Sequence, residues 1–326
     1  MQSLRSAMLV ALVLCLASWT ADGQTSSKTY RVGILASSAE TNFGPSSKVF
    51  REALQAAGWV EGQNLVLDVR YPSDYAQFQK LATDLVRLKV DVIVSLGTPA
   101  TLAAKRATTT IPIVMESLSD VVATGLVPSL ARPGGNVTGV SGFAPELSGK
   151  RLELIREILP QAERIAVLTN RSNPVTDPVV HAIESAARQM RMKLKIIDIH
   201  QRTELAPAFE TMRRERADAL VIVADPSLFT ERPLIVQLAA QHKLPTIYEM
   251  RLFPEAGGLL SYGPLPQERF QRMAAYVDRI LRGAKPGDLP IERPTTFELV
   301  VNLRASQSLG LTIPRSVLVR ADEIIQ

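Results

Sequence analysis

The chain alternates between short, continuous apolar runs and longer segments in which apolar residues recur every three or four positions. A short apolar run bounded by turn residues is typical of a buried strand, whereas the longer spacing places apolar residues on one face of a helix. In chain order, the pattern predicts strand 31–36, helix 46–57, strand 65–70, helix 78–88, strand 91–96, helix 99–107 and strand 111–115. Alternation of this kind predicts a parallel sheet with helices on both faces.

The same order of elements occurs a second time farther along the chain. The predicted elements are strand 164–169, helix 177–192, strand 194–199, helix 205–216, strand 218–224, helix 231–242 and strand 245–249. The register is close, because Arg31 and Ile111 are 80 positions apart, as are Arg164 and Leu244. The repeat predicts an α/β fold of two lobes, each a small doubly wound parallel sheet. One continuous sheet is the weaker alternative.

Segments rich in glycine and proline mark where the chain passes between the predicted lobes. We expect lobe 1 to span residues 30–142, with 263–290 returning to it. We expect lobe 2 to span residues 143–262, with 291–326 completing it. The chain would then cross between the lobes two or three times, which suits a hinge about which the lobes close as rigid bodies.

The first residues have the layout of a secretory signal peptide. Arg5 precedes the apolar run 8–17, and small residues at positions 21 and 23 precede a predicted cut. We therefore expect residues 1–23 to be removed and the mature chain to reside in the periplasm. A membrane anchor is the alternative, but the apolar run is well short of the ~20 residues that span a bilayer.

Composition narrows the chemistry that the chain can carry. Cys15 is the single cysteine and lies in the leader, so the mature chain has no disulfide, thiolate metal site or cysteine nucleophile. His181, His200 and His242 are far apart in sequence and form no paired metal motif. We therefore expect no catalytic residue, no metal and no cofactor. The formal net charge is +5, but the basic residues are scattered along the chain and no aromatic residues are interleaved with them. No nucleic-acid partner is therefore expected.

Candidate ligand-binding residues follow from the ends of the predicted strands. In open α/β sheets, ligands bind beyond the carboxyl ends of the strands, and in two facing lobes those ends would line one cleft. The candidates are Ser37, Ser38, Thr98, Asp120, Asn173, Asp225, Tyr248 and Tyr262.

The polar candidates suit a small zwitterion or acid. Ser37, Ser38 and Thr98 could offer hydroxyls and, with neighbouring helix N-termini, backbone N–H groups to a carboxylate. Asp120 and Asp225 could receive an ammonium group. Thr98 and Asp225 each precede a proline, so an ordinary helix N-cap is the alternative for both.

The two tyrosines among the candidates could stack on an apolar part of a ligand. The alternative for Tyr248 and Tyr262 is ordinary packing inside a lobe. The hypothesis of a binding cleft therefore depends on the whole set at matched strand ends.

Several longer segments resemble one protein family. They are 58–64 (GWVEGQN), 97–100 (GTPA), 129–139 (SLARPGGNVTG), 255–264 (EAGGLLSYGP), 309–314 (LGLTIP) and 321–323 (ADE). In this order and spacing they resemble the ABC transporter substrate-binding protein family, whose characterised members include tryptophan/tyrosine-type binding proteins. The likeness runs from about Tyr30 to Ile325.

The resemblance implies the type I periplasmic-binding fold. Separately, the absence of enzyme motifs predicts that the chain is not an enzyme, and we expect a monomer. The resemblance also implies capture of a small molecule for an importer with separate permease and ATPase subunits at the inner membrane. An amino acid, with an aromatic one as the first guess, or a related small acid is the implied ligand. A receptor that reports to a membrane sensor and an exported enzyme on the same fold are the two rivals.

The chain departs from the family in one place that concerns the candidate site. The family often has Ser-Asp-Pro-Val after the last strand of the first repeat, and this chain has Ser119-Asp120-Val121-Val122. The aspartate is kept, but the turn that presents it lacks the proline.

Overall fold

The computed structural model describes residues 28–36, 40–117, 120–142, 145–173 and 176–326. The predicted leader, together with Ser37 and Ser38, lies outside the described residues. Within them, no helix combines the length and the apolar character that crossing a membrane requires.

The first sheet is built from the first half of the repeat. Over the described residues it contains five parallel strands in the order β2-β1-β3-β4-β5. The strands are β1 (Tyr30–Leu35), β2 (Leu65–Arg70), β3 (Val92–Leu96), β4 (Ile113–Ser117) and β5 (Val137–Ser141). Helices α2 (Glu40–Ala56) and α11 (Pro266–Leu281) pack on one face, and α3 (Gln77–Arg87) and α4 (Thr98–Ala107) pack on the other.

The second sheet contains seven strands over the described residues, in the order β12-β11-β10-β9-β8-β6-β7. They are β6 (Arg164–Thr169), β7 (Lys193–Asp198), β8 (Ala219–Ile222), β9 (Thr246–Tyr248), β10 (Leu260–Pro264), β11 (Phe297–Asn302) and β12 (Glu323–Ile325). The pairing of β10 with β11 is antiparallel, and the other described pairings in this sheet are parallel.

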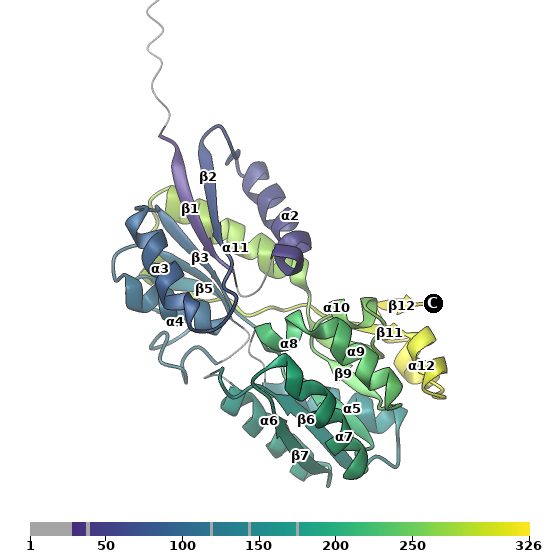
Figure 1. The fold of residues 1–326 in the computed structure, drawn as a ribbon. Coiled ribbons are helices and arrows are strands. Elements are labelled where there is room, and N and C mark those ends of the chain that lie inside the picture. Colours follow the sequence, from purple (N-terminus) through teal and green to yellow (C-terminus); the bar gives the residue numbers. More distant parts are fainter. Residues whose placement is uncertain (1–27, 37–39, 118–119, 143–144, 174–175) are drawn as a thin grey trace, which may run out of the picture.

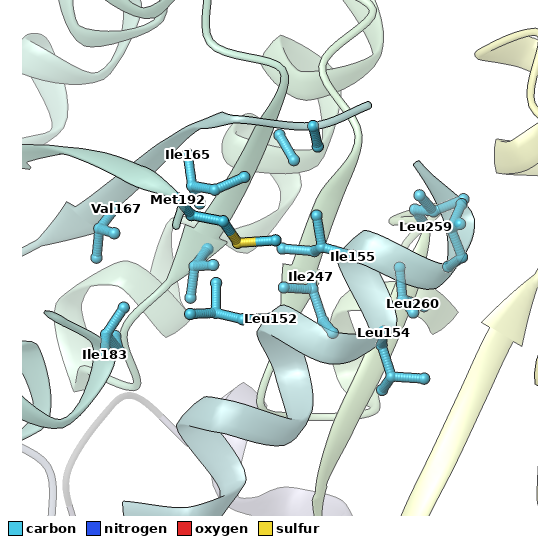
Figure 2. Packing of buried hydrophobic residues seen from close by; sticks show 14 of the residues in the cluster. Leu152, Leu154, Ile155, Ile165, Val167, Ile183, Met192, Ile247, Leu259 and Leu260 are labelled. Atoms are coloured by element: carbon cyan, nitrogen blue, oxygen red, sulfur yellow. The ribbon is translucent and has the colours of Figure 1, made fainter. Parts of the chain in front are cut away.

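Helices cover both faces of the second sheet as well. The larger helices are α5 (Pro145–Ile158) and α6 (Thr176–Gln189) on one face and α7 (Leu205–Arg214) and α9 (Arg232–Gln241) on the other. Figure 2 shows Leu152 and Ile155 of α5 packed beside Ile165, Val167 and Ile247 of the sheet. The short elements are η1 (Arg202–Glu204), α8 (Pro226–Thr230), α10 (Leu252–Glu255), η2 (Pro286–Asp288), α12 (Leu303–Ser308) and α13 (Arg315–Leu318).

The two sheets repeat one topology. The order β2-β1-β3-β4-β5 in the first sheet corresponds, strand by strand, to β7-β6-β8-β9-β10 in the second. Strands β11 and β12 extend the second sheet only. The predicted pair of doubly wound lobes is therefore confirmed, and the alternative of one continuous sheet is wrong.

Judged from its described elements, the chain passes between the lobes three times (Figure 1). It leaves the first lobe after β5 and enters α5, and it returns from β10 into α11. It leaves again after Ile291, which packs in the core of the first lobe, and reaches β11.

Both of the first two crossings begin with a strand that needs a glycine. Gly139 in β5 has a φ of +133°, and a Cβ there would overlap the backbone oxygen of Met115 in β4. A Cβ on Gly263 in β10 would overlap the backbone oxygen of Glu249, just beyond β9. Each crossing strand therefore lies unusually close to the fourth strand of its own lobe.

Several elements differ from the predicted ones. Helix α2 begins at Glu40, six residues before its predicted start, although Gly44 and Pro45 lie inside it. Glycine and proline usually interrupt helices, which is why the pattern places the start after them. Helix α8 and strand β12 have five and three residues, too few for a periodic pattern to predict.

Candidate functional site

Asp225 lies just beyond β8 and begins helix α8. Its side chain accepts hydrogen bonds from the backbone N–H groups of Ser227, at 2.9 Å, and Leu228, at 3.2 Å. Pro226 fits the first helical position because it has no N–H to satisfy there. Locally, Asp225 therefore has the helix-cap role that the sequence left open.

Two buried asparagines from the end of β6 meet Asp225 and its helix. Asn173 donates its side-chain N–H to Asp225 Oδ2 at 2.9 Å, and Asn170 donates to Ser227 Oγ at 2.8 Å. Asn170 is 1% exposed, Asn173 3% and Asp225 4%. Buried polar groups are costly unless hydrogen-bonded. The ends of β6 and β8 therefore carry one connected polar cluster, which contains two of the predicted site residues in direct contact.

Tyr75 reaches the same cluster from the first lobe. It lies in the turn between β2 and α3, and its hydroxyl donates to Asp225 Oδ2 at 2.5 Å. Burial raises the pKa of the Tyr75 hydroxyl above its ordinary value, and the Asp225 carboxylate raises it further, so the phenol is a firm donor. The two lobes are thus joined by a hydrogen bond to a buried carboxylate.

Sequence reasoning missed Tyr75. Its position just after strand 65–70 was the available signal, because the same strand-end rule that selected Asp225 applies there.

Thr98 lies at the carboxyl end of β3, as predicted, but it does not cap helix α4. Gly97 occupies the cap position and Thr98 is the first helical residue. The Thr98 hydroxyl is 2.6 Å from the hydroxyl of Ser117, at the end of β4, and both residues are buried. The first lobe therefore places two hydroxyls together at neighbouring strand ends.

Asp120 is partly exposed and supports its own turn. Its Oδ1 accepts from the backbone N–H groups of Val122 and Ala123, both at 3.0 Å. This geometry stabilises the turn, and Asp120 Oδ2 takes no part in these two hydrogen bonds.

A buried ion pair lies at the end of the fourth strand of each lobe. Arg151 in α5 pairs with Glu249 at 3.2 Å, and its Nε donates to the carbonyl oxygen of Tyr262 at 2.9 Å. Arg269 in α11 pairs with Glu116 in β4. Each arginine is on the helix that follows a crossing, so each pair ties the segment that has just entered a lobe to the sheet of that lobe.

Sequence reasoning missed both arginines. Glu116 and Glu249 occupy matched strand ends of the repeat, and that match was a usable signal for the acidic partners.

The two predicted tyrosines have different environments. Tyr262 in β10 is half-buried, with its ring 6.3 Å from that of Phe297. Tyr248 is fully buried and stacks on Phe253, with ring centroids 4.4 Å apart. The Tyr248 ring also borders a cavity of about 370 Å³ whose lining comes wholly from the second lobe. The structure therefore does not bring Tyr248 together with the polar candidates.

Among the described residues, no group of three or more His, Cys, Asp or Glu side chains is placed to hold a metal ion. The polar groups at the strand ends are hydroxyls, amides and single carboxylates, which can hydrogen-bond a small organic molecule.

A model of the family described as "ABC transporter substrate binding protein" matches residues 44–325. The chain belongs to the ABC transporter substrate-binding protein family. The resemblance predicted from sequence motifs is confirmed, as is the type I periplasmic-binding fold. This is a family of substrate-binding proteins rather than of enzymes, its members are typically extracytoplasmic, and their partners are a small-molecule ligand and an ABC transporter.

Relatives with stated ligands cover nearly the whole chain. A tyrosine-binding protein of Clostridioides difficile strain R20291 is 27% identical over 302 residues, which is 91% of this chain and 87% of that protein. An ABC domain from Streptococcus pneumoniae, solved in complex with L-Trp, is 26% identical with a TM-score of 0.85, and the match covers 91% of this chain and 100% of that one.

A third relative was solved in a ligand-free, open form and matches this chain less well. The ligand-free, open structure of a substrate-binding protein with adhesive properties from Clostridium difficile has the same 26% identity and the same coverage, 91% and 100%, but a TM-score of 0.67. The whole structure of this chain therefore superposes better on the L-Trp complex than on the open structure. The hydrogen bond from Tyr75 to Asp225 agrees with a closed arrangement.

Proposed function

We propose that this chain is the periplasmic solute-binding component of an ABC-type importer and that it binds an aromatic amino acid between its lobes. The similarity to the L-Trp complex carries the proposal, because it spans nearly the whole chain and has a TM-score of 0.85. The tyrosine-binding relative supports the same ligand class.

The binding groups that we propose lie at the carboxyl ends of the strands. The ligand carboxylate would meet hydroxyls at the first lobe, namely those of Thr98 and the serines at 37 and 38. Asp120 would receive the ammonium group, and the Tyr262 ring would contact the side chain of the ligand. A buried, partly aromatic site with a few fixed polar groups is the usual design of a small-molecule pocket.

Ligand capture in this proposal requires the lobes to move as rigid bodies. Three crossings connect them, and the buried Arg–Glu pairs hold the first two crossings to their sheets. A ligand that makes contacts with both lobes only in the closed form shifts the equilibrium toward closure. We also propose that residues 1–23 are cleaved on export and that the mature chain is a monomer.

A thermal-shift screen of the purified protein against all proteinogenic amino acids and a set of small carboxylic acids tests the ligand class. A ligand present at 100 times its Kd stabilises the folded state by about 2.7 kcal/mol, so a true ligand raises Tm by several degrees. We expect L-tyrosine, L-tryptophan or L-phenylalanine to give the largest shift. A larger shift with a non-aromatic amino acid, or none with any amino acid, contradicts the proposal.

A further inference from the structure

The carboxylate of Asp225 is surrounded by hydrogen-bond donors and, within the described residues, meets no cation. The donors are the backbone N–H groups of Ser227 and Leu228 and the side chains of Ser227, Asn170, Asn173 and Tyr75. A carboxylate has about four lone-pair sites. Its acceptor capacity is therefore filled in this arrangement, and a ligand ammonium has no place on it.

The donors divide unequally between the lobes. Those from Asn170, Asn173, Ser227 and Leu228 belong to the second lobe, so they stay with Asp225 whatever the first lobe does. The Tyr75 hydroxyl is the donor that comes from the first lobe. If the lobes separate, this is the hydrogen bond that breaks, and water takes the place of the phenol.

We propose that Tyr75 is an affinity-determining residue that acts through Asp225: its hydroxyl bonds the carboxylate when the lobes close, and the ligand ammonium binds elsewhere. The inference rests on the proposed function, because it assumes closure around a ligand. It changes the role of Asp225 from an ammonium partner to the acceptor of an interlobe contact. Asp120 is then the carboxylate in the candidate set that is left for the ammonium.

The size of the effect follows from the charge of the acceptor. A hydrogen bond to a charged group can change the equilibrium constant between two arrangements by about tenfold to a hundredfold. Tyr75→Phe removes the hydroxyl and keeps the ring, whose centroid lies 6.0 Å from that of Phe78. We therefore expect the ratio of closed to open molecules to fall by about tenfold or more.

The experiment measures the distance between two spin labels, one on each lobe. Cys15 is the single native cysteine, so Cys15→Ser leaves the full chain free for Gln55→Cys on α2 and Gln189→Cys on α6, two exposed positions. Distance distributions are recorded without ligand and with saturating L-tyrosine. The labelled parent should show a short-distance population of closed molecules. Adding Tyr75→Phe should lower the ratio of this population to the long-distance one by about tenfold.

Tyr30→Phe is the matched control, because Tyr30 lies at the opposite end of the same sheet and packs on Trp59. It should leave the distance distribution unchanged. In a chain that already carries Asp225→Asn, adding Tyr75→Phe should have a much smaller effect than in the parent, since the two residues act through one bond.

Two results overturn the inference. One is a short-distance population that Tyr75→Phe leaves intact, and the other is a parent that shows no such population with an amino acid that raises its Tm. Failure of the proposed ligand is seen separately. If L-tyrosine does not change the parent while Tyr75→Phe still shifts the ligand-free distribution, the ligand is wrong and the interlobe contact stands.

Discussion

The side chain of Asp225 has two roles: it stabilises the second lobe from within, and it accepts a hydrogen bond from the first lobe. The carboxylate caps α8, anchors Asn173 and meets Tyr75 from the other lobe. Only the contact with Tyr75 depends on how the lobes are placed. Substitutions in this cluster therefore separate folding from closure.

Asp225→Ala should destabilise the protein by about 2–4 kcal/mol, because it removes a helix cap and leaves several buried donors without an acceptor. Urea unfolding measures the loss. Asp177→Ala is the control, since Asp177 lies in the first turn of α6 with an exposed side chain and should change stability by less than about 0.5 kcal/mol. Equal losses in the two variants would contradict the buried role of Asp225.

Three of the six tyrosines should resist ionisation. Burial raises the pKa of Tyr75, Tyr248 and Tyr276 above the ordinary value of 10.0, and nearby carboxylates raise it further for Tyr75 and Tyr276. In the unfolded chain these phenols lose their protons near pH 10, so the free energy of unfolding should fall as pH rises above 10.

The ultraviolet absorbance of tyrosinate follows this titration. In the native protein the signal of these three tyrosines should appear only as the fold is lost at high pH, whereas in guanidinium all six should titrate together. A native titration that is already complete near the ordinary tyrosine pKa would show that they are not shielded.

At the level of the elements, the buried Arg–Glu pairs join α5 and α11, the helices that follow the first two crossings, to their sheets. A buried ion pair adds little net stability over an apolar replacement, but removing one partner leaves an uncompensated charge. The pairs at Glu116 and Glu249 are therefore best understood as fixing where α11 and α5 begin relative to the strands. That placement defines the ends of the crossings.

Glu249→Gln should lower the free energy of unfolding by about 3–5 kcal/mol, because Arg151 stays buried without its counter-charge. Glu153→Gln is the matched control on α5. Glu153 pairs with Lys150 at the surface, and losing this exposed ion pair should lower the free energy of unfolding by less than about 1 kcal/mol. Denaturant unfolding of both variants checks the difference. A loss below 1 kcal/mol for Glu249→Gln would mean that the pair is effectively solvated.

At the scale of the whole molecule, the sequence predicts the lobes well because the repeat and the buried strands are long-range, redundant signals. Thr98, Asn173 and Asp225 could be placed at strand ends because parallel strands share one carboxyl edge. Tyr248 shows where this reasoning stops. Strand β9 has only three residues, so its sequence is too short to show which side chains point to which face of the sheet. Its last residue, Tyr248, packs inward on Phe253.

The pattern of apolar and polar residues does not predict side-chain contacts between segments that are far apart in the sequence. Nothing in the local sequence pairs Tyr75 with Asp225, 150 residues away, or Arg269 with Glu116, 153 residues away. Such pairs depend on how one lobe faces the other and on how a returning helix docks. These are properties of the assembled chain, whereas periodicity reports only on each element.

In the proposed function, the two lobes close on an aromatic amino acid. Isothermal titration of the purified protein with L-tyrosine and L-tryptophan, with L-alanine as the comparison, tests it most directly. We expect one site per chain for at least one aromatic amino acid. Binding should be at least about tenfold tighter than that of L-alanine, since burying an aromatic side chain is worth well over 1.4 kcal/mol. Binding of L-alanine as tight as that of both aromatic amino acids, or no binding of any of the three, would contradict it.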